Sequence, residues 1–195
     1  DDQVQFVIDT IKEFFTGEKT PNPRPPGVLH SSSPDPRGSG VRLGVVGYGY
    51  WSPKVINGFK NTKGVEVFAI CEKDKNKWDT IKQQIPNIKI YERFEELIAD
   101  NDIDAIAITT TVSSHYRIAK ASLLNNKHVL VEKPMTEEIW QAEELINLAN
   151  KKNKVLMVGH TFLFMPAIRA LKRVIDSGEL GHIHSAVGTR ANLGL

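Results

Sequence analysis

The stretch VRLGVVGYGYWS, residues 41–52, decides the fold of this chain. Its first six residues form a short apolar run, which indicates a buried parallel strand. The run leads into Gly47-x-Gly49-x-x-Ser52, the G-x-G-x-x-G pattern with a serine in the third place. In that pattern the first glycine permits a tight turn, the second admits a pyrophosphate to the backbone, and the third packs helix against strand. The stretch predicts a dinucleotide-binding loop, although a simple strand-to-helix turn has the same local pattern.

Downstream of residue 41, predicted strands and helices alternate along the chain. Strands are predicted at 41–47, 65–71, 88–91, 104–111, 128–133 and 154–159, and helices at 53–60, 75–84, 94–100, 115–126, 136–153 and 166–178. This alternation predicts an α/β fold, a doubly wound parallel sheet with helices on both faces. Thr136 and the acidic residues after it are typical of a helix start.

An acidic residue closes the second predicted strand. Glu72 lies 20 residues after Ser52, close to the spacing of a ribose-binding carboxylate. A carboxylate there accepts hydrogen bonds from ribose hydroxyls and repels a 2′-phosphate, which favours NAD over NADP. Lys73, Lys75 and Lys77 follow closely and would weaken that discrimination. The alternative is a solvated charge at a strand end. The neighbouring Cys71 is interpreted as a small buried apolar residue rather than a reactive one.

A Glu-Lys pair ends the fifth predicted strand, in the segment 129–134. Open parallel sheets bind ligands at the carboxyl ends of their strands. Lys133 beside Glu132 could therefore position a nicotinamide or a substrate hydroxyl. Taken alone, such a Glu-Lys pair is more often an exposed ion pair than a binding site.

The regions outside this pattern differ in character. Residues 1–18 predict an amphipathic helix, and 19–40 a Pro/Ser-rich linker that cannot build a packed core. We assign 41–160 to the dinucleotide-binding domain and 161–195 to the start of a truncated second domain. A strand is expected to open at 181, with His182 and His184 on one face. No third ligand accompanies these histidines, so no metal site is expected.

Global composition excludes several classes of function. The formal net charge is +2 and the basic residues do not cluster, so no nucleic-acid partner is indicated. The single cysteine excludes an internal disulfide. No apolar run is long enough to span a bilayer, and the acidic first residues are unlike a signal peptide. We therefore expect a cytoplasmic protein without membrane contact.

Taken in order, Gly47–Ser52, Glu72, the segment 111–115 (TVSSH) and Glu132-Lys133-Pro134 resemble the Gfo/Idh/MocA family of oxidoreductases. The form GYGYW, with VEKP and then GHTFLF at 159–164, is similar to the bacterial nucleotide-sugar dehydrogenases of that family. Those oxidising the 3-hydroxyl of a UDP-linked N-acetylglucosaminuronate are the most similar in pattern. The resemblance covers about residues 42–195.

This resemblance implies a Rossmann domain followed by an α/β substrate domain with an open sheet, most of which is missing here. It implies NAD or NADP as cofactor, a nucleotide-sugar substrate, a place in polysaccharide biosynthesis, and homo-oligomers among full-length relatives. Lys133 would be the catalytic residue, and His160 could contact substrate, although a structural role is favoured for it. The residues expected to border the cofactor are Gly47, Tyr48, Gly49, Tyr50, Trp51, Glu72, Thr110, Thr111, Ser113, His115, Glu132 and Lys133.

Two functions are consistent with these residues. The first is hydride transfer from a sugar carbon to nicotinamide, with Lys133 polarising the hydroxyl. The family's second domain supplies an Asp and a His near the substrate, so this chain alone is expected to have little activity. The second is a non-catalytic dinucleotide-binding module, like the family's yeast galactose-pathway regulator; retention of Glu132 and Lys133 favours the enzyme.

The first fifteen residues carry a separate, short resemblance. DDQVQFVIDTIKEFF is similar to the last helix of pyridoxal-phosphate-dependent sugar aminotransferases. A fused or overlapping pair of genes would then account for the linker.

Overall fold

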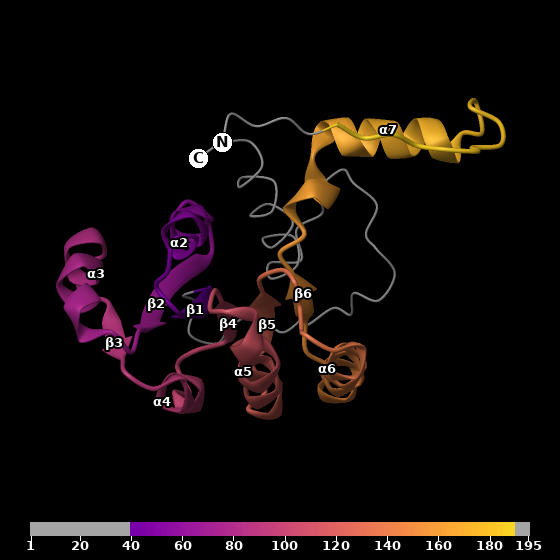
Figure 1. Cartoon of the computed structure of the whole chain (residues 1–195). Helices are drawn as coiled ribbons and strands as arrows, with labels where there is room; N and C mark the ends of the chain where they lie inside the picture. The colour runs from indigo at the N-terminus through magenta and orange to yellow at the C-terminus, as the bar shows by residue number, and fades with distance from the viewer. Residues whose placement is uncertain (1–39, 190–195) are drawn as a thin grey trace.

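A computed structural model describes residues 40–189 and shows one parallel sheet of six strands with helices on both faces (Figure 1). The strands are β1 (Val41–Val46), β2 (Val65–Cys71), β3 (Lys89–Tyr91), β4 (Ala105–Ile108), β5 (His128–Val131) and β6 (Leu156–Val158). The helices are α2 (Ser52–Lys60), α3 (Trp78–Gln84), α4 (Phe94–Ala99), α5 (Val112–Leu124), α6 (Ile139–Lys152) and α7 (Pro166–Asp176), with 3-10 turns η1 (Lys75–Lys77) and η2 (Thr161–Phe164). The predicted fold class is confirmed. The helix expected at 1–18 and residues 19–39 of the expected linker lie outside the described residues.

The strand order is β3-β2-β1-β4-β5-β6, and every neighbouring pair is parallel. The chain proceeds from β1 outward to β3 and then returns to the centre, so that β4 pairs with the other side of β1. The direction of the order therefore reverses between β1 and β4. In doubly wound sheets this reversal opens a crevice at the carboxyl ends of the two strands, where ligands bind.

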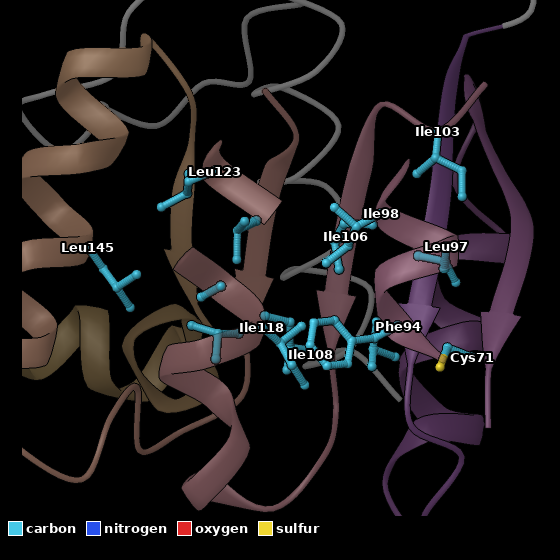
Figure 2. Close-up of a cluster of buried hydrophobic side chains, with 14 of the residues drawn as sticks. Cys71, Phe94, Leu97, Ile98, Ile103, Ile106, Ile108, Ile118, Leu123 and Leu145 are labelled. Atoms are coloured by element: carbon cyan, nitrogen blue, oxygen red, sulfur yellow. The ribbon is translucent and has the colours of Figure 1, made fainter. Parts of the chain in front are cut away.

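Alternate residues of each strand face the two helical layers, as a two-residue period requires. On one face, Leu43, Val45 and Ala107 pack in a cluster with Ile56 of α2 and Ile81 of α3. On the other face lies a second cluster, covered by α4, α5 and α6 (Figure 2). Its buried members include Val46, Ile106, Ile108, Val131, Phe94, Leu97, Ile118, Leu123 and Leu145. Burial on both faces explains why β1 from Leu43 onward and the whole of β4 have no polar side chain.

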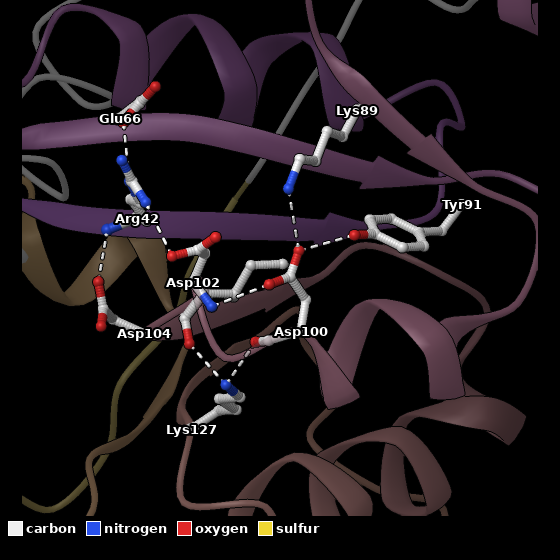
Figure 3. Close-up of polar contacts among 9 residues, drawn as sticks. Arg42, Glu66, Lys89, Tyr91, Asp100, Asp102, Asp104 and Lys127 are labelled. Atoms are coloured by element: carbon white, nitrogen blue, oxygen red, sulfur yellow. Dashed lines mark hydrogen bonds and ion pairs between the residues drawn. The ribbon is translucent and has the colours of Figure 1, made fainter.

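The amino ends of the central strands are fixed by a polar network (Figure 3). The backbone N–H of Arg42 donates to Asp104 Oδ2 at 2.8 Å. Lys127 is 7% exposed, and its ammonium donates to the carbonyl oxygens of Asp100 at 2.8 Å and Ile103 at 2.7 Å. A buried ammonium needs such acceptors, because desolvation without them is costly. These bonds hold the turn between α4 and β4, at the end of the sheet opposite the ligand crevice.

Several predicted boundaries are wrong in informative ways. Helix α6 begins at Ile139 rather than Thr136, because Glu138 caps it in a reciprocal capping box with Gln141. The hydroxyl of Thr136 instead donates to the Glu138 carbonyl at 2.9 Å. Strand β4 ends at Ile108, so residues 109–111, which were predicted as the end of the strand, form the loop before α5.

The strand expected to open at 181 is absent from residues 181–189, which have no regular secondary structure. His182 and His184 lie edge-to-face, with ring centroids 4.7 Å apart. The preceding helix α7 extends away from the sheet (Figure 1), and its apolar Ile168, Leu171 and Val174 are all exposed. Within residues 40–189, no helix has both the length and the apolar character that crossing a membrane requires.

Candidate functional site

All six strands end on one row, which runs through Tyr91, Cys71, Val46, Ile108, Val131 and Val158. The residue after each strand other than β3 continues the ladder by one further hydrogen bond. The N–H groups of Gly47, Glu72, Thr109, Glu132 and Gly159 donate to strand carbonyls at distances of 2.9 to 3.0 Å. The sheet therefore places Gly47, Glu72 and Glu132, each predicted from sequence, along one edge.

The two loop glycines differ in what requires them. Gly47 has φ +95°, and a Cβ there would lie 2.9 Å from Thr110 Cγ2 and 3.2 Å from the Thr109 carbonyl oxygen. The fold itself therefore demands glycine at 47. A Cβ on Gly49 would meet nothing within 4 Å. No internal contact of the described residues explains that glycine, which leaves an open space suited to an approaching ligand.

Ser52, the departure from the third glycine, is completely buried and joins the loop to β4. Its Oγ accepts from the Gly49 N–H at 2.9 Å and lies 2.8 Å from Thr109 Oγ1. The Thr109 hydroxyl in turn lies 3.1 Å from the Gly47 carbonyl and 3.2 Å from the Val46 carbonyl, so it donates there. The Ser52 hydroxyl must therefore donate to Thr109. The serine thus braces the loop, a role that the glycine pattern in the sequence does not show.

Glu72 is 6% exposed, so it is not the solvated strand-end charge of the alternative interpretation. Its two oxygens accept from the backbone N–H groups of Tyr48 and Asp74, each at 2.9 Å. Lys77 lies 3.6 Å from Glu72 Oε2, and its ammonium donates to the Tyr48 carbonyl at 3.2 Å. A carboxylate has about four acceptor positions, so these two backbone bonds do not use all of them. Burial, and next the charge of Glu72, raise the pKa of the Cys71 thiol to about 12, which matches its expected inert role.

The aromatic residues of the loop point in different directions. Tyr48 is buried, and its hydroxyl donates to Gln84 of α3, so only its backbone faces the loop. Tyr50 is 85% exposed and Trp51 36%. The ammonium of Lys54 stands 4.6 Å from the Trp51 ring centroid and 5.4 Å from that of Tyr50. Sequence reasoning missed Lys54, although a cation in the first turn of a helix that follows a glycine loop is itself a signal, since the dipole disfavours it without an anion.

The loop between β4 and α5 forms the next part of the edge. Thr111 caps α5 with extended backbone, and its Oγ1 lies 3.4 Å from Ser113 Oγ. The Ser114 hydroxyl lies 2.6 Å from Thr110 Oγ1 and 2.8 Å from the Thr111 carbonyl oxygen. His115 is different, because its ring is 1% exposed and both of its nitrogens face backbone carbonyls. The predicted cofactor residues of this loop thus include three near the surface and one buried beneath them.

The Glu132-Lys133-Pro134 segment follows β5, and its Lys133–Pro134 peptide is cis. Glu132 Oε2 accepts from the Lys133 N–H at 3.3 Å, and a Cβ on Gly159 would lie 3.1 Å from Glu132 Oε1. Gly159 therefore makes room for the Glu132 carboxylate. The Lys133 side chain is exposed and forms no ion pair with Glu132, contrary to the ion-pair interpretation.

His160 lies beyond the end of β6, is exposed, and immediately precedes the η2 turn as its N-cap residue. Its exposed side chain therefore stands next to the carboxyl edge. Within residues 40–189, no three His, Cys, Asp or Glu side chains are placed to hold a metal ion.

A parallel sheet with strand order reversing at β1 and β4, and a glycine loop at that point, defines a Rossmann-type dinucleotide-binding domain. The chain belongs to the Gfo/Idh/MocA oxidoreductase family. The sequence model of that family, described as an oxidoreductase family with an NAD-binding Rossmann fold, matches residues 41–160.

Several relatives place the chain among oxidoreductases. It is 34% identical over 145 residues to the uncharacterized oxidoreductase YdgJ of Escherichia coli, covering 73% of this chain and 41% of that protein. It is 29% identical over 144 residues to inositol 2-dehydrogenase of Salmonella agona, covering 72% and 43%. The chain thus spans about two fifths of the length of these relatives.

Solved structures show the same fold. The scyllo-inositol dehydrogenase of Lactobacillus casei, with bound NAD(H) and scyllo-inositol, superposes with a TM-score of 0.68 at 22% identity, covering 73% of this chain and 42% of that one. The 3-ketoreductase KijD10 of Actinomadura kijaniata, in complex with TDP-benzene and NADP, superposes with a TM-score of 0.66 at 26% identity, covering 71% and 44%. One of these structures contains NAD(H) and the other contains NADP. The cofactor preference of this chain must therefore be inferred from its own residues.

Proposed function

We propose that this chain is the dinucleotide-binding part of an NAD-dependent dehydrogenase that oxidises a hydroxyl of a nucleotide-linked sugar. The observation that carries the proposal is the common row at the carboxyl edge. Gly49, Glu72 and Lys133 follow three different strands and lie along the edge where ligands of such sheets bind.

The loop suits a dinucleotide in its details. The open space at Gly49 admits a pyrophosphate to the backbone, and the start of α2 offers a positive dipole end. Lys54 adds a cation at the same place. Glu72 is held by two backbone N–H groups and keeps acceptor positions for the ribose hydroxyls. Its charge repels a 2′-phosphate, which supports NAD over NADP, while Lys77 at 3.6 Å moderates the preference.

The chemistry assigned to the edge is modest. A bound nicotinamide supplies the hydride acceptor. The exposed ammonium of Lys133 orients the sugar hydroxyl by donating a hydrogen bond to its oxygen or by relaying its proton. In the oxidative direction the hydroxyl proton must leave to a base within hydrogen-bonding reach or through one water.

Relatives support the substrate class. Inositol 2-dehydrogenase and D-apiose dehydrogenase act on polyhydroxylated rings or sugars, by their names. KijD10 is a ketoreductase whose structure contains a TDP-linked ligand. The exposed Lys133 favours an enzyme over the non-catalytic alternative, since a pure binding module has no need of a free ammonium at this edge.

Titration calorimetry of the chain with NAD⁺ and NADP⁺ tests the proposal. We expect saturable binding of NAD⁺, with NADP⁺ weaker by about tenfold, which corresponds to about 1.4 kcal/mol. Glu72→Ala should weaken NAD⁺ binding and abolish that ratio, because the ribose hydroxyls lose their acceptor and the 2′-phosphate no longer meets a repelling charge. A ratio unchanged in the variant would remove Glu72 from the site.

Gly49→Ala tests the role of the glycine loop separately from that of Glu72. Its new methyl group meets nothing within 4 Å, so the free energy of unfolding should change by less than about 0.5 kcal/mol. Dinucleotide affinity should fall at least about tenfold, because the methyl group occupies the space assigned to the pyrophosphate. Undiminished affinity in a stable variant would exclude this loop as the phosphate site.

A further inference from the structure

One buried histidine connects two segments of the carboxyl edge. His115 lies in the first turn of α5, with its ring 1% exposed. Its Nδ1 lies 2.9 Å from the Pro134 carbonyl oxygen and its Nε2 lies 3.1 Å from the Thr110 carbonyl oxygen. Carbonyl oxygens only accept, so the ring donates to one of them as neutral imidazole and to both as imidazolium. In either form it has no free polar atom for a ligand.

The two carbonyls belong to opposite sides of the proposed site. Thr110 stands beside the glycine loop, since its methyl group lies 2.9 Å from where a Cβ on Gly47 would be. Pro134 directly follows Lys133. The sheet ladder between these segments extends to the bond from the Glu132 N–H to the Ile108 carbonyl, 3.0 Å long. Beyond that bond, the His115 ring links the two segments again.

We propose that His115 is a positioning residue that fixes the Lys133 backbone relative to the glycine loop, and so places the lysine ammonium against the nicotinamide half of the dinucleotide. This inference rests on the proposed function and refines the expectation that His115 borders the cofactor. The Lys133 side chain is long and exposed, so its reach depends on where its backbone stands. Displacement by about 1 Å in such an arrangement can cost about a hundredfold in rate.

A purely structural role makes a different prediction from a positioning role. Loss of buried hydrogen bonds would loosen the whole edge and weaken every ligand. Loss of positioning would affect only the nicotinamide half. ADP-ribose reports on the glycine loop and Glu72 alone, since it lacks nicotinamide, whereas NADH reports on both halves.

The experiment titrates the full chain with ADP-ribose and NADH, following heat and nicotinamide fluorescence. His115→Phe fills the space without a donor, and His115→Asn retains one. For the phenylalanine variant we expect ADP-ribose affinity within about twofold of the parent, NADH affinity lower by about tenfold, and loss of the enhanced NADH fluorescence. The asparagine variant should recover most of the NADH affinity. Lys133→Ala should show the same loss, and adding His115→Phe to it should cost nothing more.

Equal losses for both ligands, undiminished NADH binding, or full additivity with Lys133→Ala would each overturn the inference. If the unaltered chain binds neither ADP-ribose nor NADH, the proposed function itself is wrong. This result differs from every outcome that overturns the His115 inference alone. An independent measurement needs no variant: a ring N–H proton of His115 that donates to a buried carbonyl oxygen should exchange slowly with water in NMR spectra. Exchange as fast as that of an exposed histidine would also show that the His115 ring does not link the two segments.

Discussion

Ser52→Ala tests the most specific structural departure from the glycine pattern. The substitution removes an Oγ that is completely buried and makes contacts of 2.9 Å to the Gly49 nitrogen and 2.8 Å to Thr109 Oγ1. Each such bond contributes about 0.5–1.5 kcal/mol net. Because Gly49 is exposed, water can replace one of the two bonds, whereas the partly buried Thr109 hydroxyl loses its donor. We expect the free energy of unfolding to fall by about 1–3 kcal/mol, out of a total of about 5–15 kcal/mol.

Urea unfolding followed by far-ultraviolet circular dichroism measures this loss of stability. A double-mutant cycle then shows how much of the loss belongs to the contact between Ser52 and Thr109. Thr109→Val removes the other hydroxyl, so the double variant should lose about 1 kcal/mol less than the sum of the single losses. Ser52→Gly restores the common pattern and should be no more stable than the alanine variant, because glycine adds backbone entropy to the unfolded chain. Additive single losses, or a glycine variant more stable than the parent, would show that tight packing rather than the hydroxyl matters at position 52.

Two further predictions concern the fold. Gly47→Ala should lower the free energy of unfolding by about 2–4 kcal/mol, because φ is +95° and the new Cβ meets Thr110 at 2.9 Å; a urea-measured loss below about 1 kcal/mol would contradict the loop geometry. Burial lowers the pKa of His128 from its ordinary 6.5 to about 4. Because the unfolded ring binds a proton that the folded ring refuses, stability should decline as pH falls from about 6.5 to about 4, by up to about 3 kcal/mol. His128→Asn keeps an acceptor for the Val155 N–H, now 3.1 Å from Nδ1, and should lack this part of the decline; parallel pH curves for parent and variant would argue against it.

The central features of the fold follow from local chemistry and could be predicted. The run 41–46 is apolar on both faces because both faces are covered by helices, and Gly47 is required by its own backbone angle. The spacing from Ser52 to Glu72 places the carboxylate directly after β2, since the helix and strand between the loop and Glu72 have an ordinary length. What spacing could not show is that Glu72 is buried and already bound by two backbone N–H groups.

The missed features are those whose partners are distant in sequence or subtle in their local pattern. Ser52 and Thr109 are 57 residues apart, and nothing in either local stretch connects them. His115 and Pro134 are 19 residues apart, and only the fold shows that the ring turns inward. The start of α6 was predicted wrongly for a local reason: Thr136 is the better N-cap by residue type, but the reciprocal pairing of Glu138 with Gln141 sets the first residue of the helix at Ile139.

Polar contacts at the amino edge of the sheet stabilise the fold, whereas those at the carboxyl edge support the proposed binding site. At the amino edge, Lys127 and Asp104 satisfy backbone groups, and these contacts close the turns. At the carboxyl edge, polar contacts such as those of Ser52 and His115 lie beneath the surface and hold the loops from inside. The side chains of Lys133 and Lys54 are exposed above these contacts, and neither forms an ion pair with an acidic residue of the described range 40–189. Such an arrangement keeps the loops fixed while their cations stay available to an anionic ligand. Substitution of the buried group should therefore change stability and geometry together, and substitution of the exposed cations should change binding alone.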